Sequence, residues 1–123
     1  MNNEEKYRSL IEQASDGIVI TNLEGEILEI NNSIKRMIGF TDEEMIGHHL
    51  TEYLPDVDID TIPLRISELL KGKSLLYERR LLRKDGTTLE VEINSKMAST
   101  QTLIGFIRDI SQRKKAAEDL RKS

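Results

Sequence analysis

The sequence predicts a single α+β domain built on a mostly antiparallel sheet, and three observations support this fold class. Two strand-like runs lie near the amino terminus, with a turn sequence between them. Three more strand-like runs follow residue 74. Helical patterns occupy the residues between these two groups, so we expect them to connect the strands and to cover one face of the sheet.

The amino-terminal elements follow from the spacing of apolar residues. Residues 1–14 predict an amphipathic flanking helix, because apolar side chains recur there at positions i, i+3, i+4 and i+7. These side chains are Tyr7, Leu10, Ile11 and Ala14. The β-branched run at 18–20 predicts the first strand and residues 26–30 predict the second. The turn sequence at 22–25 makes the two strands a hairpin.

Three short helical segments and one longer helix are expected next, and two of the short segments can be placed by their capping residues. Asn32 or Ser33 is expected to cap the first segment, which ends at Gly39. Thr41 and Glu44 have the spacing of a capping box, which predicts a helical turn that ends by residue 47. The longer helix starts at residue 60 or 61, accepts a proline in its first turn, and ends before residue 72. Its apolar stripe is Ile62, Ile66, Leu69 and Leu70.

The carboxy-terminal half predicts three strands and a last helix. Residues 75–83 read as a strand, the turn Asp85–Gly86 follows, and apolar residues alternate with polar ones over 89–94. Residues 103–110 form the fifth strand pattern, and residues 111–123 lack Gly and Pro, as expected for a helix. This order of elements agrees with an antiparallel sheet covered by the central helices.

Composition excludes several function classes. The chain has 123 residues, no Cys, no Trp and a net charge of −4, with 4% aromatic residues. Without cysteine there is no thiolate metal site and no cysteine nucleophile, and few aromatic residues argue against direct nucleic-acid binding. No apolar run reaches the roughly 18–20 residues of a membrane span, and the first residues lack signal-peptide character. We therefore expect a cytoplasmic domain without membrane insertion.

Six short sequences, taken in their order and spacing, resemble a PAS domain. They are ASDGI at 14–18, GEILEIN at 25–31, MIGFT at 37–41, EMIG at 44–47, RKDG at 83–86 and DISQRK at 109–114. The resemblance covers nearly the whole chain and implies a sheet of order 2-1-5-4-3 with helices on one face. It also implies a core at 15–110 and a sensory role in a larger protein, such as a histidine kinase or a diguanylate cyclase, whose effector domain lies in the same polypeptide.

A ligand pocket, if one exists, is expected between the sheet and the helices. Its candidate lining is mostly apolar, with three polar groups that we expect to point inward. The candidates are Ile20, Asn31, Ile34, Met37, Ile38, Leu54, Ile66, Leu70, Val91, Ile93, Ser95, Phe106 and Arg108. Two alternatives remain open from the sequence: a bound small molecule, or a core filled by these side chains.

The resemblance also implies an output latch at Asp109, Ile110 and Ser111, where the last strand passes into the last helix. Asp109 is expected to hold a basic group or a backbone amide, and the Ser111 hydroxyl is expected to cap the helix. The two terminal helices predict a homodimer, with packing of 1–14 on its own sheet as the alternative. A ligand-free dimerisation scaffold is the rival to the sensory function.

Cofactor and catalytic signals are weak. The helix near 61–71 has no histidine for haem, and the sequence after the second strand has no cysteine for covalent flavin chemistry, while a non-covalent small molecule stays open. Asp56, Asp58 and Asp60 resemble the start of a calcium loop, but Thr61 and Ser67 stand where glycine and glutamate are required. His48 and His49 read as a surface pair, and we expect no metal site and no catalysis by this chain.

Overall fold

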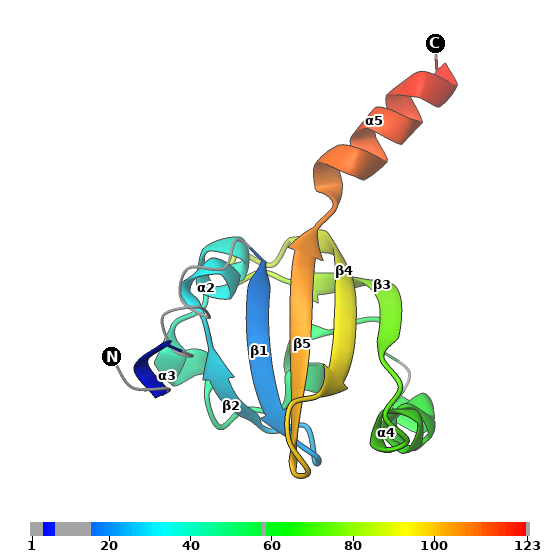
Figure 1. The fold of residues 1–123 in the computed structure, drawn as a ribbon. Helices are drawn as coiled ribbons and strands as arrows, with labels where there is room; N and C mark the ends of the chain where they lie inside the picture. Colours follow the sequence, from blue (N-terminus) through cyan, green and yellow to red (C-terminus); the bar gives the residue numbers. More distant parts are fainter. Residues whose placement is uncertain (1–3, 7–15, 58, 123) are drawn as a thin grey trace.

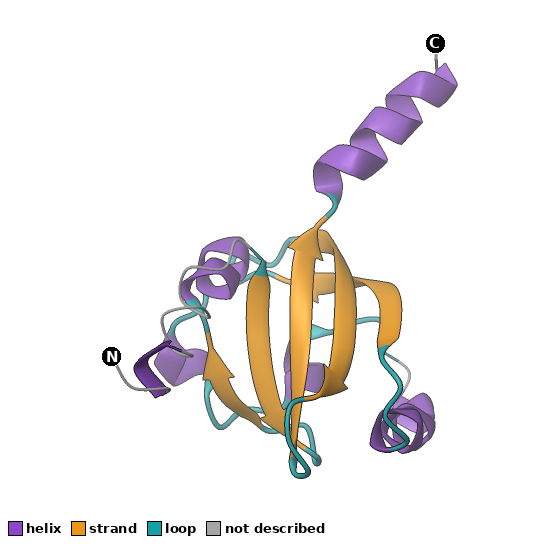
Figure 2. Ribbon diagram, viewed as in Figure 1, coloured by secondary structure: helices purple, strands orange, loops and turns teal. Residues whose placement is uncertain are grey.

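The computed structural model describes residues 4–6, 16–57 and 59–122. Figures 1 and 2 show a five-stranded sheet with helices at its sides and behind it, and a last helix that projects away from one end. The elements are β1 (Gly17–Asn22), β2 (Ile27–Ile30), α2 (Asn32–Ile38), α3 (Asp42–Met45), the 3-10 turns η1 (Leu50–Tyr53) and η2 (Ile59–Thr61), α4 (Ile62–Leu70), β3 (Leu75–Leu82), β4 (Thr88–Met97), β5 (Thr102–Asp109) and α5 (Ser111–Lys122).

The sheet has the order β2-β1-β5-β4-β3, and the expected α+β class with order 2-1-5-4-3 is confirmed. All four neighbouring pairs are antiparallel. The central strand β5 pairs with β1 on one side and with β4 on the other, so the last strand in sequence lies in the middle of the sheet. It then continues directly into α5.

The main core fills the face of the sheet that carries the helices. Its buried members come from every strand and from the helical region, as expected for strands that alternate inward and outward. They are Val19, Ile27, Ile30, Ile34, Ile38, Met45, Tyr53, Leu54, Leu81, Leu89, Val91, Ile93 and Ile107. A smaller apolar cluster of Ile18, Ile20 and Ile104, with Phe106 against it, is separate from this core. It belongs to the alternate positions of β1 and β5, so it lies on the other face, which we call the outer face.

The start of α2 differs from the expected cap. Asn31, rather than Asn32 or Ser33, is the N-cap residue, and its side chain accepts a hydrogen bond from the Ile34 amide. The helix ends as expected at Gly39, whose φ of 82° favours glycine. In α3 the capping box is confirmed: the Thr41 side chain accepts from the Glu44 amide while the Glu44 carboxylate accepts from the Thr41 amide.

The α4 region agrees with expectation in place but differs in detail. The 3-10 turn η2 precedes α4, and Thr61 at the N-cap makes no side-chain capping bond. Leu69 is buried, whereas Leu70 is 55% exposed, so the apolar stripe is narrower than the sequence suggested. The 3-10 turn η1, absent from the sequence prediction, begins after His49.

Most of the expected helix at 1–14 lies outside the described residues, and so do its side chains Tyr7, Leu10, Ile11 and Ala14. Residues 4–6 are helical. Within the described part of the chain, no helix is both long and apolar enough to span a bilayer.

Candidate ligand-binding site and output junction

A partly open cavity of about 120 Å3 lies between α4, the η1 region and the inner face of the sheet. Aliphatic side chains from α4 and from strands β1, β3, β4 and β5 make most of its wall. The lining residues are Val19, Thr21, His49, Leu50, Thr51, Leu54, Val57, Ile62, Arg65, Ile66, Leu69, Leu75, Tyr77, Leu81, Ile93, Ser95, Leu103, Ile104, Gly105 and Ile107. An apolar hollow with a few polar groups is the usual form of a small-molecule site.

Three of the polar groups that line the cavity lie on α4, β3 and β4, beside Thr21 of β1 and the residues His49 and Thr51 of the η1 region. The Tyr77 hydroxyl of β3 lies 3.1 Å from the Ser95 hydroxyl of β4. Arg65 of α4 places its guanidinium carbon 5.0 Å from the centroid of the Tyr77 ring, a cation–π contact. Among the described residues that line the cavity there is no Asp or Glu, so this part of the wall has cationic and hydroxyl groups but no carboxylate.

His49 forms part of the cavity wall through a fixed set of hydrogen bonds. Its Nε2 atom lies 2.7 Å from the Glu24 carbonyl oxygen, and its Nδ1 atom accepts from the Thr51 amide at 3.2 Å. This pairing requires the neutral ring with the hydrogen on Nε2. Gly25 leaves room for the ring, because a Cβ atom there would lie 2.7 Å from Nε2. The ring therefore joins the β1–β2 turn to η1.

Only some of the expected pocket residues line this cavity. Leu54, Ile66, Ile93 and Ser95 do so. Ile34, Ile38 and Val91 are instead buried in the main core, with Met37 packed against it, and none of the four is among the residues that line the cavity. Their positions fit the alternative of a filled core at that end of the domain.

The expectation was wrong for five candidates, each for a structural reason. Ile20 and Phe106 belong to the outer-face cluster, because the inward positions of their strands are the alternate ones. Leu70 is exposed at the end of α4. Asn31 is fully buried, but its side chain is used in hydrogen bonds to the backbone of neighbouring elements and does not line the cavity. Arg108 is exposed and forms an ion pair with Asp16 at 3.2 Å.

Sequence reasoning missed most of the residues that line the cavity, and four of these bear on its chemistry or shape: His49, Arg65, Tyr77 and Gly105. Tyr77 had a usable signal, since it alternates with Leu75 and Leu81 on one face of its strand. Gly105 had a weaker one, because an isolated glycine in a strand often marks a place where something approaches the backbone closely. A Cβ atom at Gly105 would meet its neighbours at an ordinary 3.8–3.9 Å.

The junction between β5 and α5 is held by local hydrogen bonds. The Asp109 carboxylate accepts from the Ser111 amide at 2.9 Å and from the Ser111 hydroxyl at 2.6 Å. Asp109 thus holds a backbone amide, one of the two expected alternatives, while the Ser111 hydroxyl donates to Asp109 instead of capping the helix. Ile110 between them is buried, and its amide donates to the Glu90 carbonyl oxygen at 3.1 Å.

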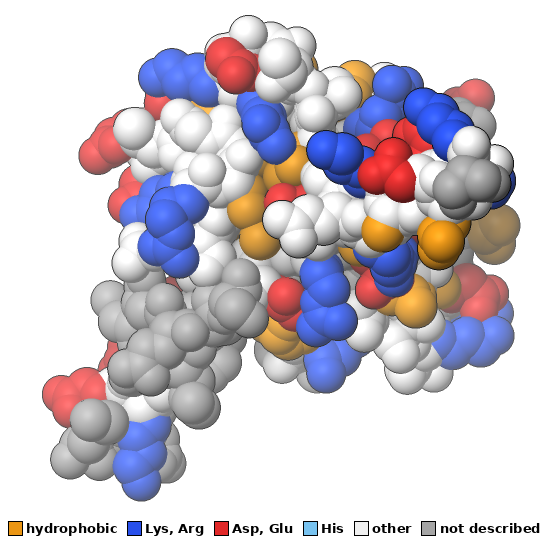
Figure 3. All heavy atoms as spheres, turned by 90° about the horizontal axis from the view of Figure 1, so that it is seen from above, with side chains coloured by type: hydrophobic (Ala, Val, Ile, Leu, Met, Phe, Trp, Pro, Cys, Tyr) orange, Lys and Arg blue, Asp and Glu red, His pale blue; other side chains and the backbone are white. Residues whose placement is uncertain are grey.

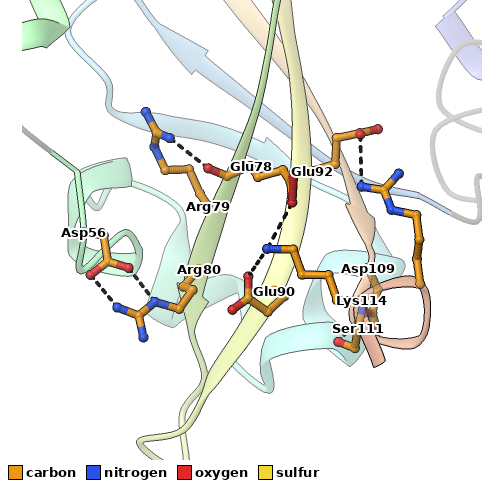
Figure 4. A network of polar contacts seen from close by, with 10 residues as sticks. Asp56, Glu78, Arg79, Arg80, Glu90, Glu92, Asp109, Ser111 and Lys114 are labelled. Atoms are coloured by element: carbon orange, nitrogen blue, oxygen red, sulfur yellow. Dashed lines mark hydrogen bonds and ion pairs between the residues drawn. The ribbon is translucent and has the colours of Figure 1, made fainter. Parts of the chain in front are cut away.

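Ion pairs tie the first turn of α5 to the outer face of the sheet (Figure 4). Lys114 lies 3.1 Å from Glu78 of β3 and 3.2 Å from Glu90 of β4. Arg113 lies 3.5 Å from Glu92 of β4. Hydrogen bonds from Lys114 to Glu78 and Glu90 raise the pKa of this lysine. The rest of the helix extends beyond the sheet (Figure 1), so the contacts of α5 are concentrated at its start.

Charges of both signs are interleaved on the face seen from above in Figure 3. Lys and Arg side chains lie beside Asp and Glu side chains there, without one large region of a single sign. Among the described residues, no group of three His, Cys, Asp or Glu side chains is placed to hold a metal ion. Asp56 of the acidic loop is paired with Arg80 through two hydrogen bonds of 2.6 and 2.9 Å.

The Asp56–Arg80 pair predicts a specific acid dependence of stability. Hydrogen bonds from Arg80 hold the pKa of the Asp56 carboxyl below its usual 3.8. A carboxyl whose pKa is lower in the folded than in the unfolded chain stabilises the fold at pH values above its unfolded-state pKa. This contribution disappears as the pH falls through the folded-state pKa. We therefore expect Asp56→Asn to lower the melting temperature near pH 7 and to lose this effect as the pH falls below 3.8 and through the lowered folded-state pKa.

Melting curves followed by circular dichroism test this dependence, with Arg80→Gln as the background control. The Asp56→Asn substitution should have little effect once Arg80 is absent, because the pair is then already broken. The pair is exposed, so the expected effect is small. A difference between wild type and Asp56→Asn that grows as the solution becomes more acidic would contradict the prediction.

Comparisons with known proteins agree with this architecture. A family model described as the PAS fold matches residues 5–110. The chain is 26% identical over 124 residues to sensor histidine kinase TmoS of Ectopseudomonas mendocina, covering 95% of this chain and 13% of that protein. It is 26% identical over 119 residues to the C4-dicarboxylate transport sensor protein DctS of Rhodobacter capsulatus, covering 89% of this chain and 18% of that protein. The chain thus spans less than a fifth of each of these relatives.

Among solved structures, a domain of a sensory box sensor histidine kinase/response regulator from Geobacter sulfurreducens is similar. It is 29% identical with a TM-score of 0.77, and the match covers 86% of this chain and 93% of that one. The PAS domain of an HTR-like protein from Haloarcula marismortui has the same TM-score at 22% identity, covering 87% of this chain and 91% of that one. With the family model matching most of its length and the sheet order observed directly, the chain belongs to the PAS-fold family.

Proposed function

We propose that this chain is a sensory module that binds a small molecule in the cavity beside α4. The observation that carries the proposal is the cavity itself: about 120 Å3 of space, mostly apolar, with hydroxyl and guanidinium groups at its wall. Ordinary protein cores leave few voids larger than a water molecule, so a hollow of this size between α4 and the sheet favours a binding role. The similarity to sensor histidine kinases supports a sensory role.

The route of the signal would be β5. Gly105 and Ile107 of this strand line the cavity, and two residues later the strand reaches the Asp109–Ser111 junction. A ligand that shifts β5 would therefore displace the start of α5 and its ion pairs to β3 and β4. Such coupling requires a ligand with different affinities for two positions of the strand and helix.

The partner of this signal would be an effector in the same polypeptide, of the histidine kinase or diguanylate cyclase type. The curated relatives are longer than the matched segment, which supports a linked effector. Any kinase or cyclase activity then lies outside this chain. We further propose that the domain acts in the cytoplasm as a homodimer, with α5 and residues 1–14 as its flanking helices.

Filling the cavity tests the proposal. In Gly105→Val, the new side chain would enter the cavity from β5 without a close contact at Cβ, where the nearest atoms lie at 3.8–3.9 Å. We expect the melting temperature to stay equal or rise, because a β-branched residue replaces glycine in a strand and fills empty space. Compounds that raise the melting temperature of the wild type in a thermal-shift screen should have no effect on Gly105→Val.

The matched control is Phe106→Leu, on the same strand but on the outer face. This variant should respond to the same compounds as the wild type, since its side chain does not line the cavity. Compounds that stabilise Gly105→Val as strongly as the wild type would contradict binding in the cavity. A wild type without any ligand response would favour the ligand-free dimerisation scaffold.

A further inference from the structure

Arg65 is a cation that lines the cavity and has no counter-ion among the residues that the structure describes. It is half-buried, and it is one of the residues that line the cavity. Within the described part of the chain, no carboxylate lies within ion-pair distance of its guanidinium. The nearest acidic residue of α4, Glu68, is engaged by Lys73 at 2.7 Å. The guanidinium rests on the Tyr77 ring instead.

An anionic partner stabilises a half-buried guanidinium more than it stabilises an exposed guanidinium. Partial burial removes part of its hydration, and the cation–π contact with Tyr77 compensates for only some of that loss. A carboxylate offers two acceptor oxygens that match the guanidinium donors in a paired geometry. The described residues of the wall supply no such carboxylate, so a ligand would supply it.

The hydroxyl groups beside Arg65 add a second donor for the same ligand. Tyr77 and Ser95 share one hydrogen bond between their hydroxyl oxygens at 3.1 Å. Two hydroxyl groups carry two hydrogens, so one hydrogen stays available to donate. His49 does not compete for this ligand, because both of its ring nitrogens are occupied by Glu24 and Thr51.

We propose that the ligand is a small monocarboxylate with an apolar body, an inference that rests on the proposed ligand-binding function of the cavity. Its carboxylate would pair with Arg65, and its body would lie against Leu54, Leu69 and Ile93. One carboxylate fits because Arg65 is the only Lys or Arg among the lining residues of the described cavity. The cavity is slightly smaller than the roughly 150 Å3 hollow that holds benzene, which suits a short branched acid or a single ring.

Calorimetric titration with matched acids and amides tests this assignment. The probes are isovalerate with isovaleramide and benzoate with benzamide, each pair alike in shape and different in charge. We expect at least one acid to bind the wild type about tenfold or more tightly than its amide. In Arg65→Gln this preference should disappear, while the weak binding of the amide stays unchanged.

Arg79→Gln is the matched control, because Arg79 also contacts the Tyr77 ring, at 4.8 Å, but does not line the cavity. This variant should keep the preference for the acid. Equal binding of acid and amide, or unchanged acid binding in Arg65→Gln, overturns the carboxylate assignment; if Gly105→Val still abolishes that binding, the ligand cavity stands. Failure of every acid to bind the wild type also overturns the assignment. The proposed ligand-binding function itself is overturned only if the wild type responds to no compound in the thermal-shift screen.

Discussion

Asn31→Ala is expected to lower the free energy of unfolding by about 3 kcal/mol, because one fully buried side chain holds three backbone groups. Its Oδ1 atom accepts from the Ile18 amide at 2.9 Å and from the Ile34 amide at 3.1 Å. Its Nδ2 atom donates to the Asp16 carbonyl oxygen at 3.0 Å. Alanine would remove the cap of α2 and also remove the side-chain partner of the Ile18 amide in β1 and of the Asp16 carbonyl oxygen before it, which costs more than the loss of an ordinary cap.

Urea unfolding followed by circular dichroism measures this loss, and Asn32→Ala is the matched control. Asn32 is the neighbouring asparagine, is exposed, and is the first residue of α2 rather than its cap. We expect its replacement to change stability by less than about 0.5 kcal/mol. Similar losses in the two variants, or a loss below about 1 kcal/mol in Asn31→Ala, would show that Asn31 does not clamp β1 to α2.

Ile110→Ala is expected to cost about 2–4 kcal/mol and to release the start of α5 from the sheet. Ile110 is 2% exposed, its amide donates to the Glu90 carbonyl oxygen, and its carbonyl oxygen accepts from the Lys114 amide. It is thus the buried point at which β5 becomes α5. Hydrogen exchange should become faster at the amides of residues 111–114, in addition to the loss of global stability.

Leu64→Ala serves as the comparison for Ile110→Ala. Leu64 is an aliphatic residue in a helix but is 67% exposed, so its truncation should change stability by less than about 0.5 kcal/mol. Unchanged exchange at 111–114 in Ile110→Ala would mean that the ion pairs of Arg113 and Lys114 hold α5 without the buried anchor.

The fold was predictable because local signals agreed with one another. The capping box at Thr41 and the turn at Asp85 each fixed a boundary within a few residues of the observed one. The pocket was harder to predict because β5 is apolar on both faces. Leu103 and Ile107 line the cavity, Phe106 packs in the outer cluster, and Ile104 belongs to that cluster and also borders the cavity. Alternation gives two sets of residues in such a strand but does not say which set faces the helices.

The polar residues were misplaced for a related reason. An asparagine before a helix reads equally well as a cap or as a pocket group, and only the distances from Asn31 to β1 identify the clamp. A charged side chain between the apolar positions of a helix, such as Arg65 of α4, is usually expected to face solvent. The position of Arg65 over Tyr77 depends on packing between α4 and β3, which are distant in sequence. Contacts between residues distant in sequence decided both roles.

Native mass spectrometry of the purified chain, recorded before and after denaturation, tests the central claim of a ligand cavity beside α4 most directly. The predicted result is a small mass excess on the wild type that disappears on denaturation and is absent from Gly105→Val. The contradictory result is the same mass excess on Gly105→Val, since a ligand bound there cannot occupy the filled cavity.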